Sequence, residues 1–506
     1  QTSKEKIAFS DQSIPDANAK LILDGKKVLI EPNKAKNLFA MHFDDLEIYL
    51  SVHRFSWLHK LETNQSEVWA AHLWKVWHDN FFSKITGWHW HPYTASERAV
   101  NILDFEREHA NFDIFPNLDD SLQRHAKVIL KNLEYFGDYG TSNHLANNGR
   151  GLYRIGLKLD NQDIISIGKS ILLNESERIF LPSGLLNEES SHYHLLYTQR
   201  YIDVWLAAVR HGREEAELFF KVAQRCLAVL PHLFLGNKLS LIGDISPDCE
   251  PDYLSCLYTK EKTGWLARLS FEEMQHFLKL GQTIEICDAN LLQKDGLYKG
   301  QFEGWSGIWH CARDGWSAMP GHGHQDIGSC ELMFNQTLIL VDSGRDRYGD
   351  SSKAQKYIFP SAHSSLTINN EFPFPINKPY YSEGFREKIC GLSPTFSNKE
   401  NAVYINHKGF SQLSNVGSYS RCWLFKDNSV RIKDDIKGSA NVKIARYIQT
   451  PIEPKIVAGN IILTQGNFKV RITVELEGHF IIEPTFFWTS YGVGYEGRRI
   501  CFDNNV

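Results

Sequence analysis

Histidine and aspartate side chains that could bind a metal are concentrated between Pro320 and His363. The segment begins Pro-Gly-His-Gly-His-Gln-Asp, so His322 and His324 share one face if the backbone is extended. Apolar runs typical of strands follow; one of them ends at Asp342, and His363 directly precedes another. Two imidazoles and one carboxylate, with a fourth position left to water, are an ordinary zinc ligand set. This segment therefore predicts a metal-braced active site.

The alternative is that these side chains are unrelated surface or hydrogen-bonded histidines. The chain has 21 histidines, so a lone His-x-His pair would be explained more simply in that way. The placement of the candidate ligands at the ends of predicted strands favours the metal site.

Length and charge limit the classes of protein and partner. A chain of 506 residues is too long for one core of ordinary size, so we expect two large domains. The net charge is −5, and no run of Lys and Arg resembles a nucleic-acid patch, so an anionic substrate must be met by a local cluster. The 13 Trp residues could offer flat faces to sugars, although most Trp side chains simply pack.

The nine cysteines show no CxxC pair, which argues against a disulfide framework or a zinc ribbon. Their odd number leaves at least one thiol unpaired and favours a reducing compartment. No apolar stretch is long enough to span a membrane, and none forms a signal-type leader. The sequence begins at Gln1 rather than Met, so the presence of a removed leader stays open.

The periodicity of apolar residues changes once along the chain. Residues 37–291 show apolar positions three and four apart, which predicts an α-helical domain after an N-terminal extension of residues 1–36. Residues 292–506 contain short β-branched and aromatic runs separated by Gly, Asn and Asp turns, as expected for an antiparallel β-sandwich. Helices first and strands second exclude an alternating α/β fold.

With these features in view, the chain resembles the heparinase II/III family of polysaccharide lyases over nearly its whole length. Residues 50–58, 90–98, 142–148 and 189–194 carry the resemblance in the helical part. The order and spacing of Gly-His-Gly-His-Gln-Asp, Val-Asp-Ser-Gly and Ser-Ala-His-Ser carry it in the second part. The resemblance implies an incomplete α/α toroid followed by a C-terminal antiparallel β-sandwich, with a cleft between them.

The resemblance also implies roles for individual residues. The catalytic set is Tyr193, His322, Asn143 and His144, with Tyr348 near the place where alginate-cleaving relatives have a second tyrosine. The zinc ligands are His324, Asp342 and His363. Substrate contacts are expected from Asn147, Trp90, His192 and Arg345. The chain departs from the family at Ser364, where an Asn is usual, and at Asn147, where one heparin-cleaving branch has Glu, so the substrate stays undetermined.

These residue types suit β-elimination from a uronate sugar. The C5 proton is weakly acidic beside an ionised carboxylate, so donors such as Asn143 and His144 must mask that charge. Tyr193 is expected to act as base at C5 and as acid toward the departing oxygen, if positive potential lowers its pKa from about 10. His322 would supply that potential, or a second proton-transfer group. Elimination consumes no water, so the zinc is expected to brace the cleft.

Some of these residues have simpler interpretations. Tyr193 could be a core tyrosine with Tyr197 as the actor, and the two asparagines could be helix caps or loop hydrogen-bonders. Other residues are expected to be structural: Trp88, Trp90 and His91 by packing, Arg98 by an ion pair, and Asp326 by bonding to a histidine.

The leading hypothesis is a lyase that cleaves a uronic-acid-containing polysaccharide, such as a glycosaminoglycan, capsular or exopolysaccharide chain. The alternatives are a glycoside hydrolase, which needs a facing carboxylate pair, and a non-catalytic glycan-binding protein of a polysaccharide gene cluster. The expected partner is an anionic polysaccharide, with no nucleic acid and no membrane span. A homodimer stays open, as do a periplasmic or secreted location, implied by the family, and a cytoplasmic one.

Overall fold

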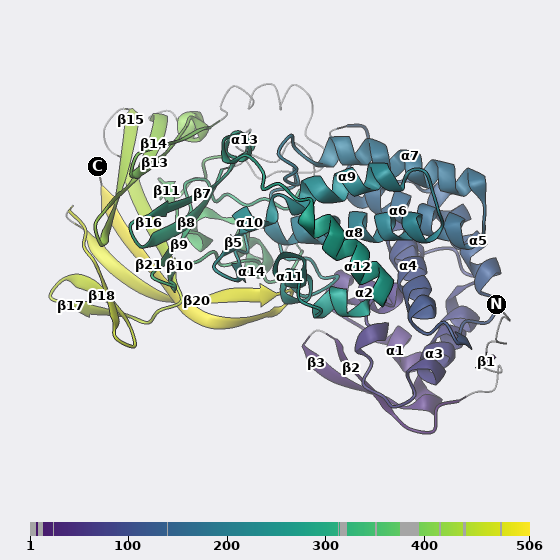
Figure 1. The fold of residues 1–506 in the computed structure, drawn as a ribbon. Coiled ribbons are helices and arrows are strands. Elements are labelled where there is room, and N and C mark those ends of the chain that lie inside the picture. Colours follow the sequence, from purple (N-terminus) through teal and green to yellow (C-terminus); the bar gives the residue numbers. More distant parts are fainter. Residues whose placement is uncertain are drawn as a thin grey trace.

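The computed structural model describes residues 7–8, 14–23, 25–138, 140–311, 313, 321–349, 352–374, 394–413, 416–438, 442–475 and 478–505. Pro320, the first residue of the histidine-rich motif, lies outside these ranges. Helices make up most of the chain up to residue 294, and strands most of it from residue 297 onward. Figure 1 shows most of the helices at one end of the molecule, with β1, β2 and β3 beside them, and the long C-terminal strands at the other end. The predicted order, helices first and antiparallel strands second, is confirmed.

The helical part contains α1 Lys36–Ala40, α2 Leu46–Arg54, α3 Ser66–Phe81, α4 Pro92–Glu108, α5 Leu118–Lys131, α6 His144–Lys158, α7 Gln162–Ile179, α8 Ser191–Arg210, α9 Ala216–Leu227, α10 Leu230–Leu233, α11 Pro251–Thr259, α12 Phe271–Gln282 and α13 Ala289–Lys294. Short strands lie among and before them: β1 Ile7–Ala8, β2 Ala19–Leu23, β3 Lys26–Ile30, β4 Phe112–Asp113, β5 Phe234–Leu235 and β6 Lys238–Leu239. Among the described residues, no helix has the length and apolar character needed to cross a membrane.

The most buried helix is α8, which carries Tyr193 near its first turn. Eighteen of its 20 residues, from Ser191 to Ala208, are buried, so the helix is enclosed on all sides instead of having one solvent face. Ser190 caps its N-terminus by accepting a hydrogen bond from the backbone N–H of Tyr193. Because the cap bonds the backbone of Tyr193, it fixes the position of this residue in the first turn of α8.

The strands after residue 297 form antiparallel sheets. The sheet orders are β10-β9-β8-β7, β11-β16-β21-β20, β12-β13-β14-β15 and β17-β18-β19. Their bounds are β7 Leu297–Phe302, β8 Trp305–His310, β9 Cys330–Phe334, β10 Thr337–Leu340, β11 Leu366–Ile368, β12 Thr395–Lys399, β13 Ala402–His407, β14 Val416–Lys426, β15 Ser429–Gly438, β16 Lys443–Thr450, β17 Pro454–Val457, β18 Asn460–Gln465, β19 Phe468–Ile472, β20 His479–Ser490 and β21 Val493–Asn505, with one short helix, α14 Ser352–Gln355. The predicted hairpin between residues 330 and 341 is confirmed as β9 and β10.

Two further expectations concern cysteine and arginine. All eight cysteines in the described part of the chain are free, so none of them supports a disulfide framework.

Arg98 is fully buried as expected, but it makes no ion pair in the described residues. Its guanidinium donates to His125 Nε2 and to the carbonyls of His53 and His89, each at 2.9 Å, and lies 4.0 Å from the centre of the Trp77 ring. The predicted ion pair is therefore replaced by carbonyl and aromatic contacts.

Glycines allow α6 to lie close against α7. A Cβ built on Gly168 would lie 2.5 Å from the backbone nitrogen of Tyr153 and 2.8 Å from its Cα. Backbone atoms cannot move aside as a flexible side chain would, so only glycine fits this contact. The contact matters for the site because α6 begins at His144, directly after Asn143.

We expect Gly168→Ala to lower the free energy of unfolding by about 1–3 kcal/mol, because the added methyl group forces α6 and α7 apart. Urea denaturation measures the change. Ser166→Ala, at an exposed position of α7, is the matched control and should stay within about 0.5 kcal/mol of the parent. Equal stability of the two variants would show that the helices do not depend on this close contact.

Candidate active site

Three backbone segments meet at the first turn of α8. The N–H of His322 donates to the carbonyl of Glu188 at 2.8 Å, and the N–H of Asp244 donates to the carbonyl of His322 at 2.9 Å. The Ser190 hydroxyl donates to the carbonyl of Asp244 at 2.7 Å. These bonds hold residues from the helical and strand parts of the chain in fixed register, so the side chains they carry have defined positions.

His322 lies between Asp244 and Tyr193. Its Nδ1 lies 3.0 Å from Asp244 Oδ2, so in a neutral ring the proton is on Nδ1 and Nε2 keeps a lone pair. The imidazole stacks on the Tyr193 ring with centroids 3.6 Å apart and an interplanar angle of 12°. Its side chain is 18% exposed, so the histidine can be reached from solvent while its bond to Asp244 sets its orientation.

Tyr193 and Tyr348 form a hydroxyl pair, with the two oxygens 2.7 Å apart. Burial raises the pKa of Tyr193 well above its ordinary value, although the hydrogen bond from Tyr348 acts in the opposite direction. Burial likewise raises the pKa of Tyr348, and Tyr193 adds to that rise. The carboxylates of Asp248, Glu47 and Asp244 raise the pKa of Tyr193 further, so the condition that neighbouring positive potential lowers it is not met in this state.

The Asn143 amide is held by Glu188 and Tyr197. Its side-chain nitrogen donates to one Glu188 oxygen, its backbone N–H donates to the other at 2.8 Å, and the Tyr197 hydroxyl donates to its side-chain oxygen at 2.9 Å. Asn143 occupies the N-cap position of α6, but its side chain makes no capping hydrogen bond there. Tyr197 is 1% exposed and committed to Asn143, whereas Tyr193 faces His322.

His144 follows Asn143 and lies at the more open side of the cluster. Its Nδ1 is 2.7 Å from Glu134 Oε1, and its side chain is 43% exposed. Burial lowers the pKa of His144, but the Glu134 carboxylate more than offsets this, so the net shift is upward. His144 is therefore positioned to carry positive charge near Asn143.

The four predicted substrate-binding residues lie in different surroundings. Trp90 is 3% exposed and donates from Nε1 to the carbonyl of Phe81, and His192 is fully buried and accepts from the N–H of Ser246. Neither is open to a sugar, so these two assignments need correction: both side chains pack. Asn147 is also buried, and its side-chain nitrogen donates to the carbonyl of Tyr93 at 3.4 Å.

Arg345, the fourth, supports the catalytic cluster from one side. Its guanidinium donates to both oxygens of Asp244 at 2.8 and 3.0 Å, and its carbon lies 5.1 Å from the centre of the Tyr348 ring. Both contacts tie Arg345 to the protein, and its side chain is 12% exposed. We therefore assign it first to holding Asp244.

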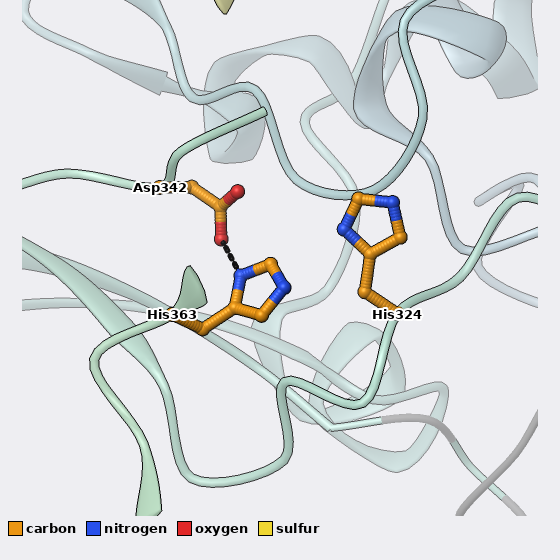
Figure 2. A group of neighbouring side chains, drawn as sticks. All are labelled: His324, Asp342 and His363. Carbon is orange, nitrogen blue, oxygen red and sulfur yellow. Dashed lines mark hydrogen bonds and ion pairs between the residues drawn. The ribbon is translucent and has the colours of Figure 1, made fainter. Parts of the chain in front are cut away.

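His324, Asp342 and His363 come together as predicted (Figure 2), with ligand-type atoms within 4.8 Å of one another. His324 Nδ1 is buried and has no hydrogen-bond partner in the described residues, because Nε2 faces Asp244 Oδ1 at 2.9 Å. An orphaned buried imidazole nitrogen beside a carboxylate and a second imidazole fits a cation. His363 Nδ1 lies 2.8 Å from Asp342 Oδ2, so a metal would replace the proton shared there.

Asp326 does not belong to this group. Its Oδ2 lies 3.3 Å from His310 Nδ1, which agrees with the expectation that it bonds to a histidine. Both side chains are buried.

Two carboxylates at the site were missed from the sequence. Asp244 lies in Leu-Ile-Gly-Asp-Ile-Ser, which has no recognisable catalytic pattern, and Glu188 directly precedes the segment 189–194 that carries a family resemblance. A buried acidic residue next to a recognised motif is the only signal that could have indicated Glu188. No comparable signal existed for Asp244.

The comparisons with known proteins concern the strand-rich part and the fold. Residues 292–499 match the model described as heparinase II/III-like, C-terminal. A crystal structure of heparinase III is similar at 14% identity, with a TM-score of 0.67, and the match covers 96% of this chain and 78% of that one. Heparan sulfate lyase HepC from Pedobacter heparinus is similar at 15% identity, with a TM-score of 0.56 and coverage of 93% and 76%. The search of curated proteins gave no match.

At these identities the solved structures establish the fold alone, and the match to the family model is confined to residues 292–499. The family and the solved neighbours are polysaccharide lyases. Residues 292–499 are therefore similar to the heparinase II/III-like C-terminal domain, and the chain as a whole is similar in fold to the heparinase III structure.

Proposed function

We propose that this protein is a polysaccharide lyase that cleaves a uronic-acid-containing chain by β-elimination. The observation that carries the proposal is the cluster of Tyr193, Tyr348, His322 and Asn143, in which two phenols, an imidazole and an amide converge. A glycosaminoglycan is the substrate class that the heparan sulfate lyase among the similar structures favours. In finer detail, we propose that the helices form an incomplete α/α toroid and the strands a β-sandwich.

The chemistry is divided among these side chains as follows. Asn143 and His144 donate to the uronate carboxylate and stabilise the charge that develops when the C5 proton leaves. Tyr193 takes that proton as its phenolate, which the Tyr348 hydroxyl stabilises by donating a hydrogen bond. The electron pair left at C5 forms the C4–C5 double bond, the C4–O4 bond breaks, and O4 receives a proton from Tyr193.

His322 has a supporting role that depends on the uronate epimer. With its proton held on Nδ1 by Asp244, Nε2 can accept a proton and so act as a second proton-transfer group. When protonated, the same imidazole lies against the Tyr193 ring and supplies positive potential. Both roles follow from the stack and the bond to Asp244.

We propose that His324, Asp342 and His363 hold zinc. Such an ion would supply a fixed positive charge that braces the strand segments behind His322. It would act on the site through Asp244, which bonds to both His324 and His322. The choice of zinc over other divalent ions rests on the two-imidazole, one-carboxylate donor set.

The hydrolase alternative is less well supported. Glu188 and Asp244 lie on opposite sides of His322, and both carboxylates are almost fully buried. An acid and base pair for hydrolysis must flank a glycosidic bond with room for sugar or water between them. An imidazole fills that space here, so the geometry favours elimination.

Tyr193→Phe should abolish turnover, because the phenyl ring keeps the stack on His322 but cannot transfer a proton. A loss of at least about 10³-fold is expected in the rate of absorbance increase near ~235 nm, where an unsaturated uronate absorbs. Tyr201→Phe, two turns along α8, removes a buried hydroxyl bonded to the carbonyl of Leu172 and serves as the matched control. Wild-type-like turnover of Tyr193→Phe would overturn the assignment.

Asp244→Asn should lower kcat by about 10–100-fold, because the ring of His322 loses the acceptor that orients it. The same change leaves Arg345 without its carboxylate, which costs stability in its own right. Asp434→Asn is the matched control, because it also removes the carboxylate that pairs with a buried arginine, here Arg421, but at a position far from the site in sequence. Loss of kcat in both variants, measured where each is folded, would show that stability and not orientation is responsible.

His324→Ala should reduce bound metal from about one ion per chain to nearly none and lower the melting temperature. Elemental analysis of purified protein and thermal denaturation measure the two effects. His407→Ala removes another buried histidine, which accepts from the N–H of Gly409, and should keep its metal. Unchanged metal content in His324→Ala would refute the ligand set.

A further inference from the structure

Three large aromatic side chains are exposed next to the candidate active site. Trp88 is 54%, Tyr135 58% and Phe136 62% exposed, and we call these three residues the aromatic rim. Single exposed apolar residues are ordinary on protein surfaces, but side chains gathered around one group indicate a binding surface.

The shared group is the carboxylate of Glu134, the residue directly before Tyr135. Glu134 Oε1 lies 2.7 Å from His144 Nδ1 and 3.5 Å from His91 Nε2. Trp88 stacks on the His91 ring, with centroids 5.6 Å apart and an interplanar angle of 27°. One buried carboxylate therefore connects Trp88, through His91, to His144, and Tyr135 and Phe136 follow that carboxylate directly in sequence.

The loop that carries Tyr135 and Phe136 is anchored at its base. The backbone N–H of Phe136 donates to Thr141 Oγ1 at 2.8 Å, and the Arg178 guanidinium donates to the carbonyls of Thr141 and Ser142. These bonds anchor the backbone of the loop, and the Tyr135 hydroxyl donates to Asp138 at 3.2 Å, which holds that ring at the surface. Exposed rings on a supported loop lose little conformational freedom on binding a ligand, which favours affinity.

We infer that the aromatic rim is a glycan subsite that packs against the face of a pyranose ring of the substrate chain, beyond the sugar bound at Asn143. The inference rests on the proposed function, and continuity with the site supports it, since His144 adjoins Asn143 and contacts Glu134. Sugar rings present C–H faces that suit aromatic rings, while their hydroxyls reach the half-exposed imidazoles. Because Glu134 is paired with His144, it adds little repulsion toward an anionic chain.

Of the two neighbouring tryptophans, Trp88 and not Trp90 is placed to contact substrate. Trp88 and Trp90 flank His89 in a 3-10 turn, Trp88–Trp90, and only Trp90 turns into the helical core. Trp88 remains in solvent beside His91. The expectation that Trp88 and His91 act only in packing is therefore replaced by a role in substrate contact.

Binding is best measured without cleavage, in a Tyr193→Phe background, by titration with heparan sulfate, hyaluronan and alginate oligosaccharides of about ten sugars. Adding Trp88→Ala, Tyr135→Ala and Phe136→Ala together should weaken binding of the preferred chain by about tenfold or more. Phe271→Ala, at an even more exposed aromatic residue, is the matched control and should leave binding within about twofold. Trp88→Phe with Tyr135→Phe keeps the rings and should retain most of the affinity.

The outcomes separate this inference from the proposed function. If the parent binds a chain but the wild-type protein gives no unsaturated product, the lyase assignment fails, and weaker binding by the triple variant still supports the subsite. In an active protein, the triple variant should raise KM more than it lowers kcat. The subsite is overturned if the triple variant binds the chain as well as the parent does, or if the parent binds no chain. It is also overturned if the triple variant loses oligomerisation while its affinity for the glycan stays intact.

Discussion

The carboxylate of Asp244 is the group on which the site most depends. One oxygen faces His322, the other faces His324, and the Arg345 guanidinium bonds to both. The side chain is almost fully buried, and the Arg345 cation and the two imidazoles hold its pKa well below the usual range even though burial acts in the opposite direction. A buried charge is tolerated only when its partners satisfy it, and here the partners are the residues that the chemistry uses.

This arrangement joins two groups that the sequence presents as separate. His322 and His324 were expected to share a face because they are two residues apart, and each offers one ring nitrogen to the same carboxylate. Their other nitrogens are then directed apart, one toward Asn143 and one without a protein partner. Asp244 thus sets which nitrogen of each imidazole is available, which sequence spacing alone cannot do.

The sequence predicted the parts of the fold that depend on local pattern. The change from helix to strand periodicity and the hairpin after His324 follow from spacing and apolar runs. The same pattern indicated a group of two imidazoles and one carboxylate, but the choice of His324, Asp342 and His363 came from the family resemblance. Contacts made through tertiary structure were not predictable: Asp244 has no motif, and Trp90 is buried while Trp88 is exposed only because of how one turn packs. The pKa of Tyr193 was not predictable for the same reason, since its burial and the carboxylates near it depend on residues that are distant in sequence.

The bonds of the site join residues that are far apart in the chain. His322 contacts Asp244 across 78 positions, Tyr348 contacts Tyr193 across 155, and His322 contacts Asn143 across 179. Contacts of such separation must meet a loop-closure cost before they stabilise the fold. The constellation therefore exists only where residues 143–244 have docked against residues 322–348. The Tyr348 N–H in turn donates to the Tyr491 hydroxyl, directly after β20, so the site also draws on a strand more than a hundred residues further along the chain.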